Sequence, residues 1–326
     1  MHTANKTLTS NVATDGGLYL PRNMPHFSQD EISELMNSSF TETFSTLLNC
    51  FYSAELTGWD VDFAIGRNPV KVLPIGRKIL IAQSWRNPEH RYAYIENNIF
   101  KKLSKQETES APTQWPRISV RIALLFSICG QLLQSGYISS KQLLDIAVDA
   151  DDPIDLMAVF YARQMGLPIG RLICGCDTTG DLWDFIHLGE INAGSAPVSL
   201  LHTLERMIHI TIGAEEVTRF LHVCKTNGTY HIPETDGVNL SDILFCAVVG
   251  KNRVADIINS AYRTDGCFLD SGTARSYGAV QDYRAKTGTS SLTLLISNIH
   301  PAFETNLISN ATGLSQSTFF EKCKII

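Results

Sequence analysis

The chain has 326 residues, enough for one large domain or two ordinary ones, and 44% of them are hydrophobic. Only 18% carry a charge, which is typical of a packed globular protein and argues against intrinsic disorder. The net charge is −6 and the basic residues form no run, so nucleic acid is not an expected partner.

Targeting signals and cysteines bear on where the protein works. The polar segment 1–17 lacks the apolar core of a signal peptide, and the longest apolar run, 122–133, is too short to span a bilayer. The 8 cysteines lie scattered in apolar segments, as buried thiols in a reducing compartment do. We therefore expect a cytoplasmic protein that does not bind membranes.

One pair of cysteines, Cys174 and Cys176 in the segment CGC, raises the question of a soft-metal site. Alternate residues of a strand do point to the same face. No other cysteine or histidine pair has matching spacing, however, so a buried strand is the better interpretation.

The N-terminal part of the chain is predicted to begin with two turns and helical structure. Residues 15–25, DGGLYLPRNMP, place glycine and proline where two turns would flank a short strand. Apolar residues then recur at helical spacing through 28–52, with Ser28 or Asp30 as the cap.

A hairpin and a polar turn are predicted next. Segments KVLPIG (71–76) and KILIAQS (78–84) read as two strands around Gly76. The stretch 79–100 continues from the second strand through a polar turn into a helix that ends near Leu103. A strand end followed by a helix start is where α/β enzymes usually keep their reactive groups.

Beyond the polar linker 104–114, helices and strands alternate, which suggests a mostly parallel sheet with helices on both faces. The predicted elements are helices at 116–136, 153–166, 182–188 and 198–213, a helix–turn–helix region at 214–263, and strands at 170–177 and 291–300.

A series of short motifs follows along the chain: DGGLYLP (15–21), WPRI (115–118), AVFYARQMGLPIGRLICGCD (158–177), DFIHLG (184–189), LER (204–206), DSGTA (270–274) and IHPA (299–302). In this order they resemble threonine synthase, a pyridoxal-phosphate (PLP) enzyme of the fold type II, tryptophan-synthase-β-like group. The resemblance implies an α/β fold, a mostly parallel sheet flanked by helices, with a small N-terminal extension. It also implies the lyase reaction that makes threonine from O-phosphohomoserine.

The resemblance fails at the cofactor's anchor. The family has His-Gly-Pro-Thr-x-x-Phe-Lys-Asp, and its lysine forms the Schiff base with PLP. This chain reads RNPEHRYAY. Aligned on Pro88, Tyr92 stands for the phenylalanine and Ala93 for the lysine. Alanine has no amine, so no Schiff base can form there.

The phosphate loop also differs. Where the family has Gly-Asn-Phe-Gly-Asn before a helix, this chain has DDPID, Asp151 to Asp155, whose carboxylates would repel a phosphate. The pattern also matches the Asp-Asp-x-x-Asp magnesium motif of isoprenyl-type synthases, but no second acidic motif accompanies it. The simpler interpretation makes Asp152 an N-cap, Pro153 the first helical residue and Asp155 part of the first turn. We predict neither a cofactor nor a metal ion here.

A third departure concerns the small domain that the family inserts between the lysine helix and the Trp-x-Arg-Ile helix. Only the linker 104–114 occupies that interval, so we expect the lid domain to be deleted. The expected organisation is an N-terminal region (1–103), the linker and a large α/β domain (115–326) in one compact unit. Gly272 and Asn298 stand where the family has histidine and threonine.

These departures predict a threonine synthase-like pseudoenzyme that acts by binding a ligand, a protein partner or another copy of itself. Two alternatives remain: acid–base chemistry without PLP, or a PLP enzyme with a relocated lysine at 71, 78 or 101. A pseudoenzyme should have a shallow, apolar or filled cleft, whereas an enzyme should show convergent polar groups with shifted pKa values. Candidate residues of a residual cleft are Arg86, Asn87, His90, Tyr92, Asn298 and His300.

Overall fold

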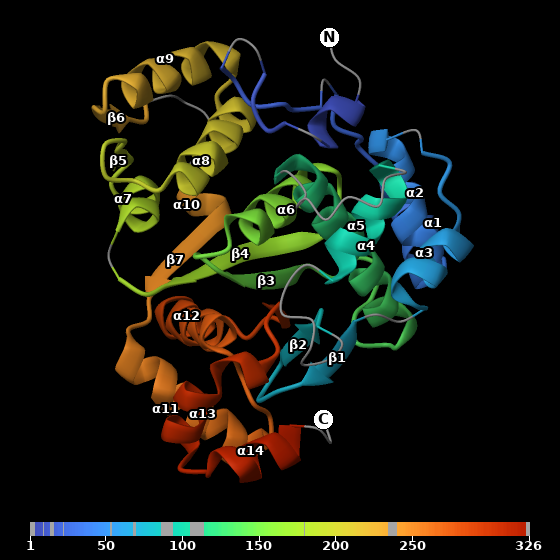
Figure 1. Cartoon of the computed structure of the whole chain (residues 1–326), viewed down its shortest axis with the longest axis vertical. Helices are drawn as coiled ribbons and strands as arrows, with labels where there is room; N and C mark the ends of the chain where they lie inside the picture. Colours follow the sequence, from blue (N-terminus) through green and yellow to red (C-terminus); the bar gives the residue numbers. More distant parts are fainter. Residues whose placement is uncertain are drawn as a thin grey trace.

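The computed structural model describes the chain except residues 1–3, 9, 14–15, 22, 53, 68–69, 86–93, 105–113, 179, 234–239 and 324–326. Its strands are β1 (Lys71–Pro74), β2 (Ile79–Gln83), β3 (Leu144–Asp149), β4 (Ile169–Cys176), β5 (Glu190–Asn192), β6 (Thr229–His231), β7 (Leu244–Val248) and β8 (Thr293–Ser297). Six of them form one sheet in the order β1-β2-β8-β3-β4-β7, and β5 pairs with β6 separately (Figure 1). Within the large sheet only β1 and β2 are antiparallel, so the expected mostly parallel sheet is confirmed.

Helices cover both faces of this sheet. The α-helices are α1 (Gln29–Asn37), α2 (Phe40–Tyr52), α3 (Gly58–Ile65), α4 (Tyr94–Ser104), α5 (Gln114–Gln134), α6 (Pro153–Gln164), α7 (Asp181–His187), α8 (Val198–Thr211), α9 (Ala214–Lys225), α10 (Leu240–Ile243), α11 (Lys251–Asp265), α12 (Ser271–Thr287), α13 (Thr305–Thr312) and α14 (Gln316–Cys323). Two 3₁₀ helices are η1 (Ala4–Leu8) and η2 (Pro301–Glu304). Helices α5 and α6 lie on one face, and α11 to α14 lie on the other (Figure 1).

Alternate residues of the central strands supply two apolar cores. Leu294 and Ile296 of β8 face the core that contains α5 and α6, whereas Leu295 faces the core with α11 and α12. A strand sends successive side chains to opposite faces, so a parallel sheet covered on both sides needs apolar residues at every position. This explains the unbroken apolar runs of these strands.

The helix boundaries follow the local caps. Ser28 caps α1 through a capping box with Glu31, as the sequence predicts. The periodic segment 28–52 is nevertheless two helices, because α1 ends at Asn37 and Ser38 adopts an extended conformation. At α6, Asp152 is the N-cap and Pro153 the first helical residue, which confirms the simple interpretation of DDPID.

Two strands of the sheet differ from the sequence-based expectation. No strand is predicted over β3, and β7 lies inside the region 214–263, which is predicted to be helical throughout. β3 lies in the centre of the sheet and β7 at its edge, but both are short runs whose two faces are covered, so the alternation that marks a strand is lost. A short apolar run of this kind has the composition of a buried helix turn.

Helix α5 is the one helix among the described residues that is long and apolar enough to cross a membrane. Its most apolar window is 83% buried inside the structure, and it packs against α1, α2 and α6. These contacts are those of a core helix.

Candidate functional site

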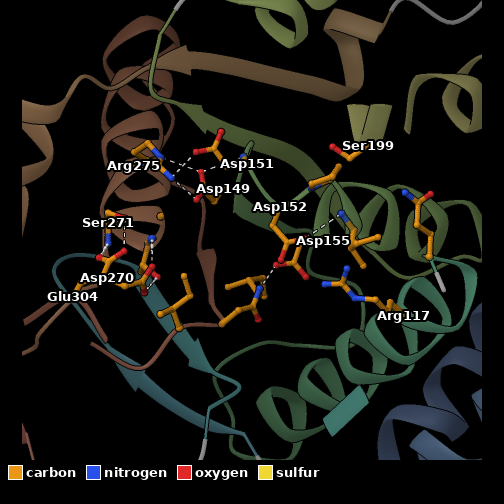
Figure 2. A pocket seen from close by; sticks show the side chains of 18 residues that line it. Arg117, Asp149, Asp151, Asp152, Asp155, Ser199, Asp270, Ser271, Arg275 and Glu304 are labelled. Atoms are coloured by element: carbon orange, nitrogen blue, oxygen red, sulfur yellow. Dashed lines mark hydrogen bonds and ion pairs between the residues drawn. The ribbon is translucent and has the colours of Figure 1, made fainter. Parts of the chain in front are cut away.

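A pocket of about 470 Å³ opens at the carboxyl ends of β3 and β8. Open parallel sheets usually bind ligands at this edge. The N-terminal ends of α6 and α12 stand on its two sides (Figure 2). It is lined by Gln114, Arg117, Asp149, Asp151, Asp152, Pro153, Ile154, Asp155, Ser199, Asp270, Ser271, Gly272, Thr273, Arg275, Ile296, Asn298, Ile299 and Glu304.

The first side, which we call the α12 wall, comprises Asp149, Asp151, Asp270, Ser271, Arg275 and Glu304. Arg275 reaches from α12 to both oxygens of Asp149 at 3.0 and 2.6 Å, and to Asp151 at 2.9 Å (Figure 2). This bidentate geometry is the strong form of an arginine–carboxylate pair. The Arg275 side chain is 14% exposed and that of Asp151 is 65% exposed, so this pair borders on solvent.

Gly272 allows α12 to approach β3 closely. A Cβ atom at this position would collide with the carboxylate of Asp149. Asp149 is held in place by Arg275, so a side chain at residue 272 would have to displace that pair. Gly272 is therefore coupled to the Asp149–Arg275 contact.

Asp270 begins α12 as a buried N-cap. Its carboxylate accepts hydrogen bonds from the backbone N–H of Thr273 at 3.0 Å, from the Thr273 hydroxyl and from the Ser297 hydroxyl at 3.0 Å. Burial raises the pKa of Asp270 to about 6, against the lowering effect of these donors. Beside it, Glu304 accepts hydrogen bonds from the backbone N–H and hydroxyl of Ser271 at 2.6 and 2.7 Å.

The opposite side, which we call the α6 wall, comprises Asp152, Asp155, Glu96 and Arg121. The Arg121 guanidinium is 6% exposed and ion-pairs with Glu96 at 2.5 Å, with Asp152 at 3.7 Å and with Asp155. The charges of Asp155 and Glu96 raise the pKa of Arg121 against the opposing effect of burial. One buried guanidinium thus contacts two carboxylates at the start of α6 and one in α4.

Asp155 joins this wall to β8. Its second oxygen accepts a hydrogen bond from the side-chain amide of Asn298, whose own oxygen accepts from the Ser84 hydroxyl at 2.7 Å. Burial raises the pKa of Asp155 to about 7, and Asp152 raises it further while Arg121 lowers it. A carboxyl group with this pKa can exchange a proton near neutral pH.

The structure brings only part of the predicted site together. Asn298, Asp151, Asp152 and Asp155 line the pocket. His300 was expected at the cleft but is not among the lining residues. It is 3% exposed, caps η2 by accepting from the backbone N–H of Ala302, and packs against the Trp85 ring at 4.3 Å between centroids.

His300 therefore has a structural role, and its burial lowers its pKa. The remaining predicted positions, Arg86, Asn87, His90, Tyr92 and Ala93, lie outside the described residues.

The sequence analysis missed Asp149, Asp270 and Arg275 as site residues. Asp149 ends a buried strand that was itself overlooked, and Asp270 opens the motif DSGTA. A charged residue at the end of an apolar run marks the carboxyl edge of a parallel sheet, so the signal for Asp149 was present in the sequence. Arg275 carries no local signal, because its partners are distant in the chain.

The described residues offer few groups for holding a cofactor or a metal ion. No lysine is among the residues that line the pocket. Within the described ranges, no group of three or more His, Cys, Asp or Glu side chains is arranged to hold a metal ion. Arg117, from the motif WPRI, lines the pocket and makes no ion pair with any described residue (Figure 2).

Comparisons with known proteins agree with this fold. The PLP bound threonine synthase from Brucella melitensis superposes with a TM-score of 0.79 at 16% identity, covering 96% of this chain and 89% of that chain. Threonine synthase from yeast gives 0.74 at 15% identity, covering 95% and 87%. The Escherichia coli enzyme gives 0.64 at 13% identity, covering 96% and 89%. These likenesses establish the fold.

Sequence comparison finds related proteins of the same kind. The family model "Threonine synthase N terminus" matches residues 2–67. "Threonine synthase-like 1" from Homo sapiens is 24% identical over 172 residues, as are its counterparts from Pongo abelii and Macaca fascicularis. The match covers 49% of this chain but 23% of each relative's length. The chain is thus similar to threonine synthase in its N-terminal segment and to threonine synthase-like proteins over about half of its length, on a fold that threonine synthases share.

Proposed function

We propose that the protein is a threonine synthase-like pseudoenzyme that holds no PLP by Schiff base and acts by binding. The observation that carries this proposal is the row of carboxylates just before and at the start of α6. Asp151, Asp152 and Asp155 line the pocket where the resemblance locates the family's phosphate loop. The residue that answers to the family's lysine is Ala93.

The lining residues do not suit the phosphate of PLP. A helix N-terminus normally attracts phosphate through its free N–H groups and its dipole. At α6 that position is taken by the Asp152 carboxylate, which accepts from the backbone N–H of Ile154 at 3.1 Å. Like charges at about 4 Å repel by roughly a few kcal/mol at an effective dielectric constant near 20. A phosphate would have to overcome this repulsion.

Charge also constrains what the pocket can bind. Among the described residues, those that line the pocket include the carboxylates of Asp149, Asp151, Asp152, Asp155, Asp270 and Glu304 and two arginines, Arg117 and Arg275. Arg121 does not line the pocket, but its ion pair with Asp155 offsets part of this negative charge. The pocket is therefore better suited to a polar ligand with a cationic group than to a phosphorylated one.

The decisive experiment incubates the purified full chain with PLP, reduces it with borohydride and measures the intact mass. The proposal expects no stoichiometric adduct, and only the scattered labelling of surface lysines that appears in a parallel sample with free pyridoxal. One stoichiometric adduct mapped to a single lysine, such as Lys71, Lys78 or Lys101, would overturn it. That result would mean that a relocated lysine anchors the cofactor.

An acid–base enzyme is a second candidate, and one observation favours it. The pocket is neither apolar nor filled, and the pKa values of Asp155 and Asp270 are raised to about 7 and about 6. Any turnover by this route should follow a pH profile set by these carboxyls. Asp155→Asn should abolish it, whereas Asp151→Asn, at the solvent edge, should not. Activity that survives Asp155→Asn would exclude this candidate.

We also propose a protein partner, most simply a second copy of the chain. Trp59 and Phe63 lie one turn apart on α3 and are 76% and 85% exposed. Lys102 stacks over the Phe63 ring at 5.1 Å and pairs with Asp60 at 3.6 Å. Exposed aromatic side chains rimmed by charges are typical of interfaces.

Light scattering on the full chain tests this proposal. Self-association should be lost in Trp59→Ala/Phe63→Ala and kept in the control Leu143→Ala, which removes an isolated exposed leucine. A wild-type chain that is monomeric at every concentration would rule out the second copy.

A further inference from the structure

Two buried thiols lie in contact at the carboxyl end of the sheet. The Sγ atoms of Cys176 on β4 and Cys246 on β7 are 3.6 Å apart. Cys176 is 8% exposed and Cys246 is 2% exposed. Together with Cys174, they face the core that contains α6 and α7. The sequence analysis set CGC aside because no second thiol group matched it, and the fold supplies that group.

The strand register decides what this thiol pair can do. Cys246 stands opposite Cys174, and Cys176 stands opposite Val248, so Cys176 and Cys246 are diagonal neighbours. With strands ~4.8 Å apart and a rise of ~3.3 Å per residue, their Cα atoms are about 8 Å apart. A disulfide needs Cα atoms within roughly 7 Å. The two sulfur atoms are therefore in contact, but the Cα atoms that carry them are too far apart for a disulfide bond.

One further atom bonded to both sulfurs would lengthen the bridge enough for this Cα separation. We propose that Cys176 and Cys246 form a dithiol site for a thiophilic electrophile with two exchangeable positions, of which trivalent organoarsenicals are the type. An arsine oxide, R–As=O, condenses with two thiols to give R–As(S–Cys)₂ and water. Two S–H bonds and the As=O bond are replaced by two As–S bonds and the O–H bonds of water, with no change of oxidation state.

Burial favours this chemistry over metal binding. The arsenical product is neutral, so it carries no charge into an apolar core, whereas a metal dithiolate would. The described residues also provide no third and fourth ligand for a metal ion. Each thiol loses only its proton, which ends in the water molecule that the reaction releases.

The two thiols have different roles in this step. Hydrogen bonding from Cys246 lowers the pKa of Cys176, and the same contact raises that of Cys246. Cys176 is also the more exposed of the two thiols. Cys176 therefore attacks first, and Cys246 closes the ring.

The test uses one equivalent of phenylarsine oxide on the full chain, read by intact mass. We expect one adduct per chain, stable to glutathione and released by dimercaptopropanol, and lost in Cys176→Ser and in Cys246→Ser. Peptide mapping of the wild-type adduct should find the two cysteines bridged, which keeps the test valid if a variant fails to fold. Absence of the adduct, or its survival in either single variant, would overturn the proposal.

Two control variants and one oxidant sharpen the result. Cys129→Ser removes a buried thiol for which the structure records no thiol neighbour, and it should keep the adduct. Cys174→Ser should also keep it. Loss of the adduct in Cys174→Ser with retention in Cys176→Ser would assign the site to the directly opposite pair instead. With hydrogen peroxide, the chain should form no bridge between Cys176 and Cys246, and rapid formation of that disulfide would refute the register argument.

Discussion

The two walls of the pocket are built from the same chemistry at different depths. In the α6 wall, Arg121, Glu96 and Asp155 are almost wholly buried, whereas in the α12 wall Arg275 pairs with Asp149, which is 19% exposed, and with Asp151, which is 65% exposed. Breaking a buried pair strands a charge in the interior, while water compensates an exposed one. The difference teaches that the α6 wall serves mainly to fix α6 against α5. In the α12 wall, water compensates part of the charge of Asp151.

The largest expected effect comes from removing the buried guanidinium. Arg121→Met should lower the free energy of unfolding by about 3–5 kcal/mol at pH 8, because Glu96 and Asp155 lose their shared partner. The measurement is chemical denaturation. The matched variant, Arg275→Met, should lower the free energy of unfolding by only about 1–2 kcal/mol. If both variants lower the free energy of unfolding equally, the two walls do not differ in how strongly their ion pairs stabilise the fold.

The pH dependence of stability gives the next effect. Burial raises the pKa of Asp155 from 3.8 to about 7, so the native state retains a proton that the unfolded chain has lost between these values. The contribution of Asp155 is therefore fully present below pH 3.8 and is lost as pH rises to about 7. At about 1.4 kcal/mol per pKa unit, the loss is on the order of a few kcal/mol.

Thermal unfolding of wild type and Asp155→Asn across this range checks that prediction. The variant has no titratable group at residue 155, so its stability should fall less steeply with rising pH. A steeper fall in Asp155→Asn would show that the sign is wrong.

A smaller effect is expected at the start of α12. Asp270→Ala removes a buried N-cap and leaves the N–H of Thr273 and the hydroxyl of Ser297 without their acceptor, at a cost of about 1–3 kcal/mol. Asp270→Asn keeps an acceptor and should recover more than half of the loss in the same denaturation assay. If Asp270→Asn recovers none of the lost free energy of unfolding, the negative charge of Asp270, and not its role as a hydrogen-bond acceptor, stabilises the start of α12.

The smallest effect on stability should come from Asp151→Asn, within about 0.5 kcal/mol, because the side chain is largely exposed. The same variant reduces the repulsion of anions at the pocket mouth. Titration with inorganic phosphate should then show tighter binding than in wild type. Unchanged binding would place the electrostatic barrier deeper, at Asp152 and Asp155.

Much of the fold follows from local signals. Asp152 and Pro153 mark the start of α6, and Gly76 marks the turn of the β1–β2 hairpin. These features depend on a few neighbouring residues, so sequence reasoning finds them. The strand β7 escaped because burial on both faces removes its alternating pattern.

The site was less predictable than the fold, for a physical reason. Its ion pairs join residues far apart in the chain, as Arg275 joins Asp149 across 126 positions. The sequence could indicate that the Asp151–Asp155 segment would repel phosphate. It could not reveal that Arg121, in the middle of an apolar helix, would hold Asp155, or that β4 and β7 would bring Cys176 to Cys246.

The position of β8 has a consequence for how the protein is made. β8 lies between β2 and β3 in the sheet, although more than a hundred residues separate it from β3 in the chain. A ribosome must therefore translate residue 297 before β2 can pair with its parallel neighbour. Until then the nascent chain holds two sheet fragments with open edges, which are prone to aggregate. The strand order therefore delays completion of the central sheet until the end of synthesis.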